Sequence, residues 1–485
     1  MRLPHRRLLA VTGLVGLVAA IGPALATSPS HAARFSAPLK LTGYTGGEPS
    51  LAIDPYHPNN VYVTSPQGIP SAVGALVGLA DKGIGFWASH DGGRSFPIKR
   101  NIGSGIGGGD SDVVVGSDGT VYVADLEAAG TAICTSTDHG RTFTSGNALK
   151  ALDSCSTITT NQQGPDNDRQ WLTTVHGQQQ NTLYLTYHDF AGGFPIIMRS
   201  TDGAQTFTPC GSILDPLGPA GRNYSPLNGT LVAKPAIDRA GRIFVEVTEP
   251  ALVSPPVGAS LSNLYIAVSP KGGCTGPTVF ENHLIYSNPG ADLGKIFNSV
   301  TVDGAGNVYV IAAGHTRAGQ TTTNVWLFVS HDRGVHWSKP IRVNTPGLKA
   351  NVMPAVVGGL RRNEVAVGWF GTKTNGDPNF LKNQWRYYVA TSFDGGKSFA
   401  QTTVTKNVIH YGDICTQGLF CGLIPGQPGN RNLADFNEMR VDPRNGNLLV
   451  AFPGDPYNRP DLPGGANDFS SSAYVVRQVG GRPLA

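Results

Sequence analysis

Carboxylates recur at matching places in this chain, each shortly before a polar turn that separates two strand-like runs. Glu48, Asp110 and Asp168 each lie six residues before such a turn, and Asp435 lies seven residues before a later one. Three other turns have a cation or an amide near the matching place: Lys234, Asn298 and Asn351. If the turns repeat around one axis, the acids gather on one arc of it. Two carboxylates, one protonated and one ionised, are what hydrolysis of a glycosidic bond requires.

These acids have three interpretations, which the sequence leaves open. In the first they are catalytic, with Asp168 and Asp110 as the acid and base and with Glu48 and Glu438 behind them. In the second, Asp110 and Asp112 bind Ca²⁺ through their oxygens. In the third, the acids only cap the starts of strands and accept hydrogen bonds from loop amides.

Three residues are candidates for substrate binding. Arg169 follows Asp168 directly and can bind an anionic sugar through two parallel hydrogen bonds. Lys234 lies near the place that the acids occupy in other units, and His188 ends a strand-like run, TYHDF, that returns to the same side. We therefore predict that all three lie near the acids.

The elements that must position these side chains are short strand–turn–strand units. Gly (63 residues) and Pro (35 residues) separate runs such as VYVTS, LYLTY and VYVIAA, and no long helical pattern follows the first 26 residues. Seven such hairpins occur, 55–84 residues apart, with turns at Asp54, Gly116, Thr174, Asp238, Asp303, Gly358 and Asp442. Each interval is long enough for a four-stranded sheet.

A second repeat lies between the hairpins. Five segments share the pattern Ser-x-Asp-x-Gly-x-x-(Phe/Trp), with Ala204 at the glycine position of one of them. Their aspartates are Asp91, Asp138, Asp202, Asp332 and Asp394. The Asp accepts backbone N–H groups in a tight turn, the Gly takes a positive φ, and the aromatic residue packs between neighbouring sheets. We interpret these Ser-x-Asp turns as structural connections between the third and fourth strands of each sheet, on the face opposite the acids.

Radial repetition of four-stranded sheets predicts an all-β fold, a single seven-bladed β-propeller. The seventh hairpin is followed by only one more strand, SSAYVVRQ, before the chain ends. We expect FSAPLKLTG, residues 35–43, to supply its missing outer strand and so close the ring. Six blades are the alternative.

The Ser-x-Asp turns resemble the Asp-box, or BNR repeat, of sialidases and other secreted bacterial propellers, and the resemblance covers nearly the whole chain after residue 26. It implies a sialidase-like glycoside hydrolase that acts on extracellular glycans. Sialidases of this kind have six blades and an arginine triad, and this chain has no Arg-Ile-Pro near its first hairpin. The alternative is therefore a non-catalytic propeller that binds glycans or proteins.

The N-terminus has the layout of a secretory signal peptide, with Arg2, Arg6 and Arg7 before an apolar run that ends in small residues. Cleavage after Ala26 fits best, and cleavage after Ala32 or an uncleaved anchor are the alternatives. Cleavage after Ala26 leaves a propeller domain over 27–485, with 34 basic and 33 acidic residues. Because the basic residues are also scattered along the chain, we expect no basic surface for nucleic acid. We predict a secreted monomer that binds an extracellular glycan or polysaccharide, with no membrane contact after cleavage and no cofactor.

The six cysteines form an even set, which favours disulfides in an exported protein. Sequence alone does not fix which cysteines pair. The pairs that we expect are Cys134–Cys155, Cys210–Cys274 and Cys415–Cys421.

Overall fold

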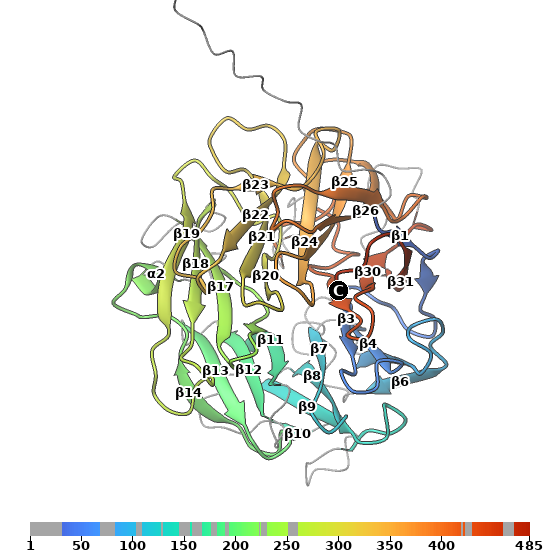
Figure 1. Ribbon diagram of the computed structural model, residues 1–485. Coiled ribbons are helices and arrows are strands. Elements are labelled where there is room, and N and C mark those ends of the chain that lie inside the picture. Colours follow the sequence, from blue (N-terminus) through green and yellow to red (C-terminus); the bar gives the residue numbers. More distant parts are fainter. Residues whose placement is uncertain are drawn as a thin grey trace, which may run out of the picture.

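The computed structural model describes residues 32–67, 83–102, 109–127, 130–144, 156–157, 167–175, 182–189, 194–222, 224, 230–250, 260–418, 421, 429–458 and 470–485. The signal peptide predicted over residues 1–26 lies outside this part of the chain. The described strands form seven antiparallel sheets, arranged in a ring around a central channel (Figure 1). The predicted seven-bladed β-propeller is therefore confirmed, and the six-bladed alternative is wrong.

In each blade the strands follow one another from the channel outward. Blade 1 contains β3 (Ser50–Ile53), β4 (Val61–Pro66), β5 (Ile84–Ser89) and β6 (Ile98–Ile102). Blade 2 contains β7 (Ser111–Val115), β8 (Val121–Glu127), β9 (Gly130–Ser136) and β10 (Ser156–Thr157). Blade 3 contains β11 (Asn167–Thr174), β12 (Leu183–Asp189), β13 (Pro195–Ser200) and β14 (Thr208–Ser212). A short helix, α2 (Pro219–Arg222), follows blade 3.

Blade 4 contains β15 (Leu231–Val232) and β16 (Ala236–Ile237), which both pair with β17 (Ile243–Pro250), and then β18 (Leu261–Val268) and β19 (Glu281–Ser287). Blade 5 contains β20 (Ser299–Val302), β21 (Val308–Gly314), β22 (Asn324–Ser330) and β23 (Ile341–Arg342). Blade 6 contains β24 (Ala350–Gly358), β25 (Val365–Thr372), β26 (Asn383–Ser392) and β27 (Ala400–Thr403), and β28 (His410–Gly412) also pairs with β26.

Blade 7 joins the two ends of the chain. It contains β29 (Glu438–Val441), β30 (Leu448–Gly454) and β31 (Ser472–Gly480), and its outer edge is formed by β1 (Arg34–Phe35) and β2 (Leu39–Lys40). Leu39 pairs with Val475, and Arg34 pairs with Gly480. Figure 1 shows the blue β1 beside the red β31. The predicted closure of the ring by an N-terminal strand is confirmed.

The second and third strands of the blades are mostly continuous apolar runs, because each blade is covered on both faces by its neighbours. In β21, for example, all seven residues are buried. The inner strands start at one end of the channel, which we call the mouth, and the strands that follow them return to it. The connections between the second and third strands therefore also lie at the mouth, whereas the Ser-x-Asp turns lie at the opposite end.

The Ser-x-Asp turns have the predicted geometry. In the turn of blade 3, Asp202 Oδ1 accepts hydrogen bonds from the backbone N–H of Gln205 and Thr206 at 3.1 and 3.0 Å. Ala204 adopts a φ of 67° at the position where the other turns have glycine. Phe207 is buried against residues of blades 2 and 3, including Tyr122. The turn therefore fixes the outer strand, and its aromatic residue packs between two sheets.

We expect Asp202→Ala to lower the free energy of unfolding by about 1 kcal/mol, since the lost hydrogen bonds are at an exposed carboxylate. Burial opposes the charge of Asp202, but hydrogen bonds from Thr206 and Ser200 lower its pKa. A lowered pKa stabilises the fold above the ordinary aspartate pKa of about 3.9, and this contribution is lost as the pH falls further. The difference between the two proteins should therefore shrink below about pH 4 in thermal melts. An equal difference at pH 7 and pH 2 would contradict this role.

Two predicted disulfides are present in the described residues. Cys210 of β14 is bonded to Cys274, which follows β18, so this bond joins the outer part of blade 3 to blade 4. Cys415 is bonded to Cys421 and closes a small loop before blade 7. Cys134 is also disulfide-bonded, and its expected partner Cys155 lies outside the described residues. No described helix is long and apolar enough to cross a membrane.

Candidate functional site

Three of the predicted acids meet at the channel mouth. Glu48 and Asp110 lie just before the inner strands of blades 1 and 2, and Asp168 lies at the start of β11 in blade 3. The carboxyl groups of Glu48 and Asp110 are hydrogen-bonded to each other, which requires a proton on one of them. Asp168 lies close enough to influence the ionisation of Asp110. The predicted gathering of acids at one side of the mouth is thus seen in these three blades.

The surroundings of the carboxyl pair keep this proton in place at neutral pH. Burial raises the pKa of Asp110 to about 7, and the neighbouring charge of Asp168 acts in the same direction. Burial also raises the pKa of Glu48 well above its ordinary value, with further contributions from Asp110 and Asp435. Like charges held close together in a site of low polarity have this effect. One of the two carboxyl groups is therefore protonated near pH 7.

Two arginines complete the group, which we call the mouth cluster: Glu48, Asp110, Asp168, Arg169, Arg431 and Asp435. The buried Arg431 lies 3.9 Å from Glu48 Oε1 and also pairs with Asp435. Arg169 Nε lies 3.6 Å from Asp168 Oδ2, and its guanidinium stacks 4.0 Å from the ring centroid of Phe297. Arg431 is not among the site residues predicted from the sequence. Its position four residues before Asp435 was the available signal.

The backbone of the mouth cluster is held in an uncommon conformation. Glu48 and Arg169 have φ values of 47° and 54°, and Ala434, which precedes Asp435, has a φ of 58°; all three lie in the left-handed region that favours glycine. Such a conformation costs a residue with a side chain about 1 kcal/mol or more. It persists because the neighbouring segments hold it, and non-glycine residues in this region are often found at functional sites.

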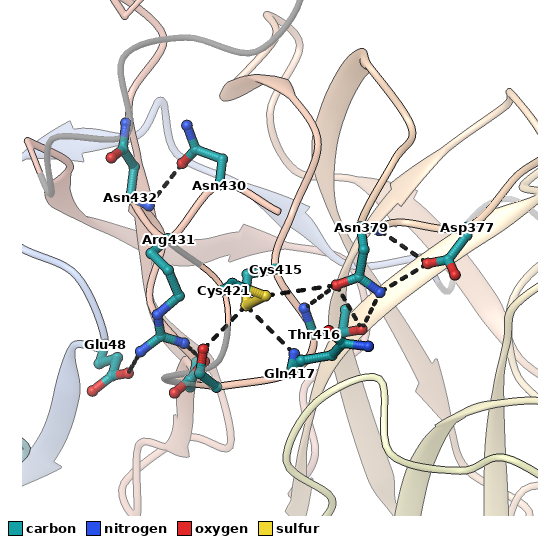
Figure 2. The surroundings of a disulfide bond; sticks show 12 residues. Glu48, Asp377, Asn379, Cys415, Thr416, Gln417, Cys421, Asn430, Arg431 and Asn432 are labelled. Atoms are coloured by element: carbon teal, nitrogen blue, oxygen red, sulfur yellow. Dashed lines mark hydrogen bonds and ion pairs between the residues drawn. A yellow bond between two sulfur atoms is a disulfide. The ribbon is translucent and has the colours of Figure 1, made fainter. Parts of the chain in front are cut away.

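The loop closed by Cys415 and Cys421 lies against the arginines of the cluster. A Cβ atom at Gly418 would lie 3.7 Å from Nη2 of Arg169. The backbone N–H of Cys415 donates to the carbonyl of Asn430, next to Arg431. Figure 2 shows Arg431 directed toward Glu48 on one side of the disulfide. The disulfide therefore fixes the segment that supplies Arg431.

Further along the channel, a second group of charges connects four blades. We call it the inner ion cluster: Ser50, Asp112, Lys234, Glu438 and Arg440. Lys234 Nζ lies 2.5 Å from Asp112 and 2.9 Å from Glu438. The hydroxyl of Ser50 lies 2.7 Å from each of these carboxylates. Burial alone would raise the pKa of Glu438, but Arg440 and Lys234 lower it to about 2. Glu438 is therefore ionised at neutral pH, and Lys234 has two carboxylate partners.

A cavity of about 430 Å³ follows the channel and is lined by residues of all seven blades. Its walls are mostly apolar, and Lys234 and Glu438 lie among them. The acids of the mouth cluster do not line it. The ring of Phe436 packs against Trp171, with the ring centroids 4.8 Å apart, and against Phe297, with the centroids 6.1 Å apart. All three residues line the cavity.

The remaining site predictions concern His188 and calcium. The backbone of His188 lies at the mouth as expected, because it pairs with Asp168 across β11 and β12. The side chain of His188 is not part of what the structure describes. In the described part of the chain, no group of three or more His, Cys, Asp or Glu is placed to bind a metal ion. Both carboxylate oxygens of Asp112 have protein partners, Lys234 on one and the Leu172 backbone N–H on the other.

Comparison with known proteins gives structural neighbours only. No family model matches the chain, and no curated protein matches it. A protein of unknown function from Dyadobacter fermentans DSM 18053 is 14% identical, covers 92% of this chain and 98% of its own, and has a TM-score of 0.47. A polysaccharide lyase of family PL25, an ulvan lyase, is 10% identical, with 93% and 95% covered and a TM-score of 0.48. A Hadza microbial sialidase is 12% identical, with 90% and 66% covered and a TM-score of 0.41. Values this low say nothing about what this chain binds or catalyses.

Proposed function

We propose that this protein is a secreted glycoside hydrolase that cleaves extracellular glycans at the channel mouth. The observation that supports this most is the hydrogen-bonded carboxyl pair of Glu48 and Asp110, with Asp168 beside it. A carboxylic acid with a pKa of about 7 next to a second carboxylate is the arrangement that general-acid cleavage of a glycosidic bond needs. The predicted signal peptide and the disulfides support export, and the five Ser-x-Asp turns support kinship with Asp-box propellers.

In the proposed reaction, the proton of the Asp110–Glu48 pair moves to the glycosidic oxygen as the bond from that oxygen to the anomeric carbon breaks. Asp168, charged beside Arg169, stabilises the positive charge that develops on the sugar, as nucleophile or as base toward water. Water then supplies its hydroxyl to the anomeric carbon, and its remaining proton restores the acid. In this proposal Arg169 binds an acidic substituent of the substrate.

The experiment that tests this proposal is an activity screen of the chain from residue 27 onward. Sialosides and plant and microbial polysaccharides would be incubated with the protein, and new reducing ends would be measured. We expect hydrolysis of at least one anionic glycan. Binding of glycans without any release of reducing ends would instead support the non-catalytic scaffold.

The pH dependence of this activity follows from the carboxyl pair. Because the acid must carry a proton, kcat/KM should fall as the pH rises above about 7, the pKa of Asp110. Asp110→Asn should lower the rate and remove this alkaline limb. A profile of kcat/KM from pH 5 to pH 9 checks this, and a wild-type rate that stays constant across this whole range would exclude the pair as the acid.

A further inference from the structure

Three aromatic side chains are strongly exposed among the described residues: Tyr56 at 49%, Phe380 at 65% and Tyr457 at 79%. Phe380 lies in the connection between β25 and β26 of blade 6, and Tyr457 lies in the connection between β30 and β31 of blade 7. Both connections join second and third strands, so both rings lie at the mouth. Tyr56 lies in the first hairpin turn of blade 1, at the opposite end of the channel.

The turn that carries Phe380 is held by hydrogen bonds to the disulfide loop. Asn379 Nδ2 donates to Asp377 Oδ1 at 2.8 Å and to Thr416 Oγ1 at 2.9 Å. The backbone N–H of Thr416 donates back to Asn379 Oδ1 at 2.8 Å. Figure 2 shows Asn379 and Asp377 on the side of the disulfide away from Glu48. Phe380 is therefore exposed on a turn that is fixed in position.

The turn that carries Tyr457 is held by buried contacts to β28 and to the segment before blade 7. Asp455 accepts from His410 Nδ1 at 2.6 Å and from Asn432 Nδ2 at 2.9 Å. Asn432 adjoins Arg431, which pairs with Glu48 in the mouth cluster. The Phe380 turn is thus fixed by Thr416 of the disulfide loop, and the Tyr457 turn by His410 and Asn432.

We propose that Phe380 and Tyr457 are sugar-binding platforms, on which sugar rings of one polysaccharide chain lie outside the mouth cluster. The apolar face of a sugar ring packs on an aromatic ring, and both surfaces are thereby removed from water. Polar groups lie near both rings: the backbone N–H of Lys382 donates to the carbonyl of Phe380, and Lys40 Nζ lies 5.2 Å from the ring centroid of Tyr457. Two separate exposed rings suit a chain of sugars, whereas a large continuous apolar patch would mark a site for a protein partner.

This inference takes its location from the proposed function and deepens it, because it implies a long glycan rather than a single terminal sugar as the substrate. Affinity electrophoresis of the chain from residue 27 onward, through gels that contain arabinan, alginate or mucin, tests it without any need for catalysis. We expect at least one of these polysaccharides to retard the protein. Phe380→Ala and Tyr457→Ala should each weaken that binding by at least about fivefold.

Tyr56→Ala is the matched control, since it removes an exposed ring from the opposite end of the channel, and it should leave the retardation unchanged. Equal effects of Tyr56→Ala and Phe380→Ala would overturn the inference, as would a lack of retardation by all three polysaccharides. Hydrolysis that is found while Phe380→Ala and Tyr457→Ala bind normally would leave the proposed function standing and refute the platforms. Binding that depends on Phe380, without hydrolysis of any substrate, would support the platforms and refute the proposed function.

Discussion

Deletion of residues 35–43 should prevent the protein from persisting as a folded monomer. These residues include β2 and the buried Leu41, whose backbone N–H donates to Ala473 of β31 at 2.9 Å. Their removal exposes the outer edge of β31, and an unpaired edge strand pairs readily with other chains. Burial of one leucine side chain contributes about 1.5–3 kcal/mol, and Leu41 packs with Leu51 and Val63 of blade 1. The deletion therefore weakens both the last blade and its contact with the first.

Size-exclusion chromatography and thermal melts would measure this effect, with the chain from residue 27 onward as the control. We expect the shortened chain to aggregate or to melt far below the control. If it eluted as a monomer and melted at the same temperature, the closure of the ring by β1 and β2 would not contribute to stability as we describe.

The fold could be predicted because its local signals repeat. Each hairpin has the same alternation of apolar runs and polar turns, and each Ser-x-Asp turn has the same acceptor and the same bend. Each of these motifs depends only on residues that are close together in the sequence, and its recurrence supported the assignment of each copy. Glu48, Asp110 and Asp168 occupy equivalent positions in three successive units. They were predicted to lie together because equivalent positions of successive blades are adjacent around the channel of a propeller.

The parts of the site that could not be predicted depend on contacts between distant, non-repeating segments. Arg431 belongs to the long connection between blades 6 and 7, which has no counterpart in the other blades. Lys234 was expected to bind substrate, whereas the structure places it between Asp112 of blade 2 and Glu438 of blade 7. No spacing in the sequence shows that these three charges meet across the channel. The role of Lys234 in substrate binding remains a prediction.

The inner ion cluster also separates the roles of the acids. Glu438 was grouped with the catalytic candidates, but Arg440 and Lys234 hold its pKa at about 2. A carboxylate with this pKa holds no proton at neutral pH, so any chemical role for it would be as an ionised group. Glu48 and Asp110, which have raised pKa values, are the groups that can donate a proton. The distinction comes from the partners of each acid and not from its position in the repeat.

If the mouth cluster is the active site, Asp168→Asn should lower kcat by at least about a hundredfold, a usual scale for the loss of an acid–base group. The asparagine keeps the oxygen that accepts from the Arg169 backbone N–H at 3.1 Å, so folding and substrate binding should be preserved. It removes the negative charge that stabilises the transition state. Removal of that charge should also lower the pKa of Asp110, because Asp168 helps to raise it. The acid would then hold its proton less tightly, and less of it would be protonated at neutral pH.

The kinetics of four proteins would separate these effects. Arg169→Ala should mainly raise KM for anionic substrates, since it removes a cation without removing a carboxylate. Asp118→Asn is the matched control, because it makes the same chemical change in the exposed hairpin turn of blade 2, at the far end of the channel. It should leave kcat and KM unchanged. If a hydrolytic activity of the wild type survived Asp168→Asn undiminished, the acids at the mouth would be structural, because a carboxylate beside the reacting sugar cannot lose its charge without an effect on the rate.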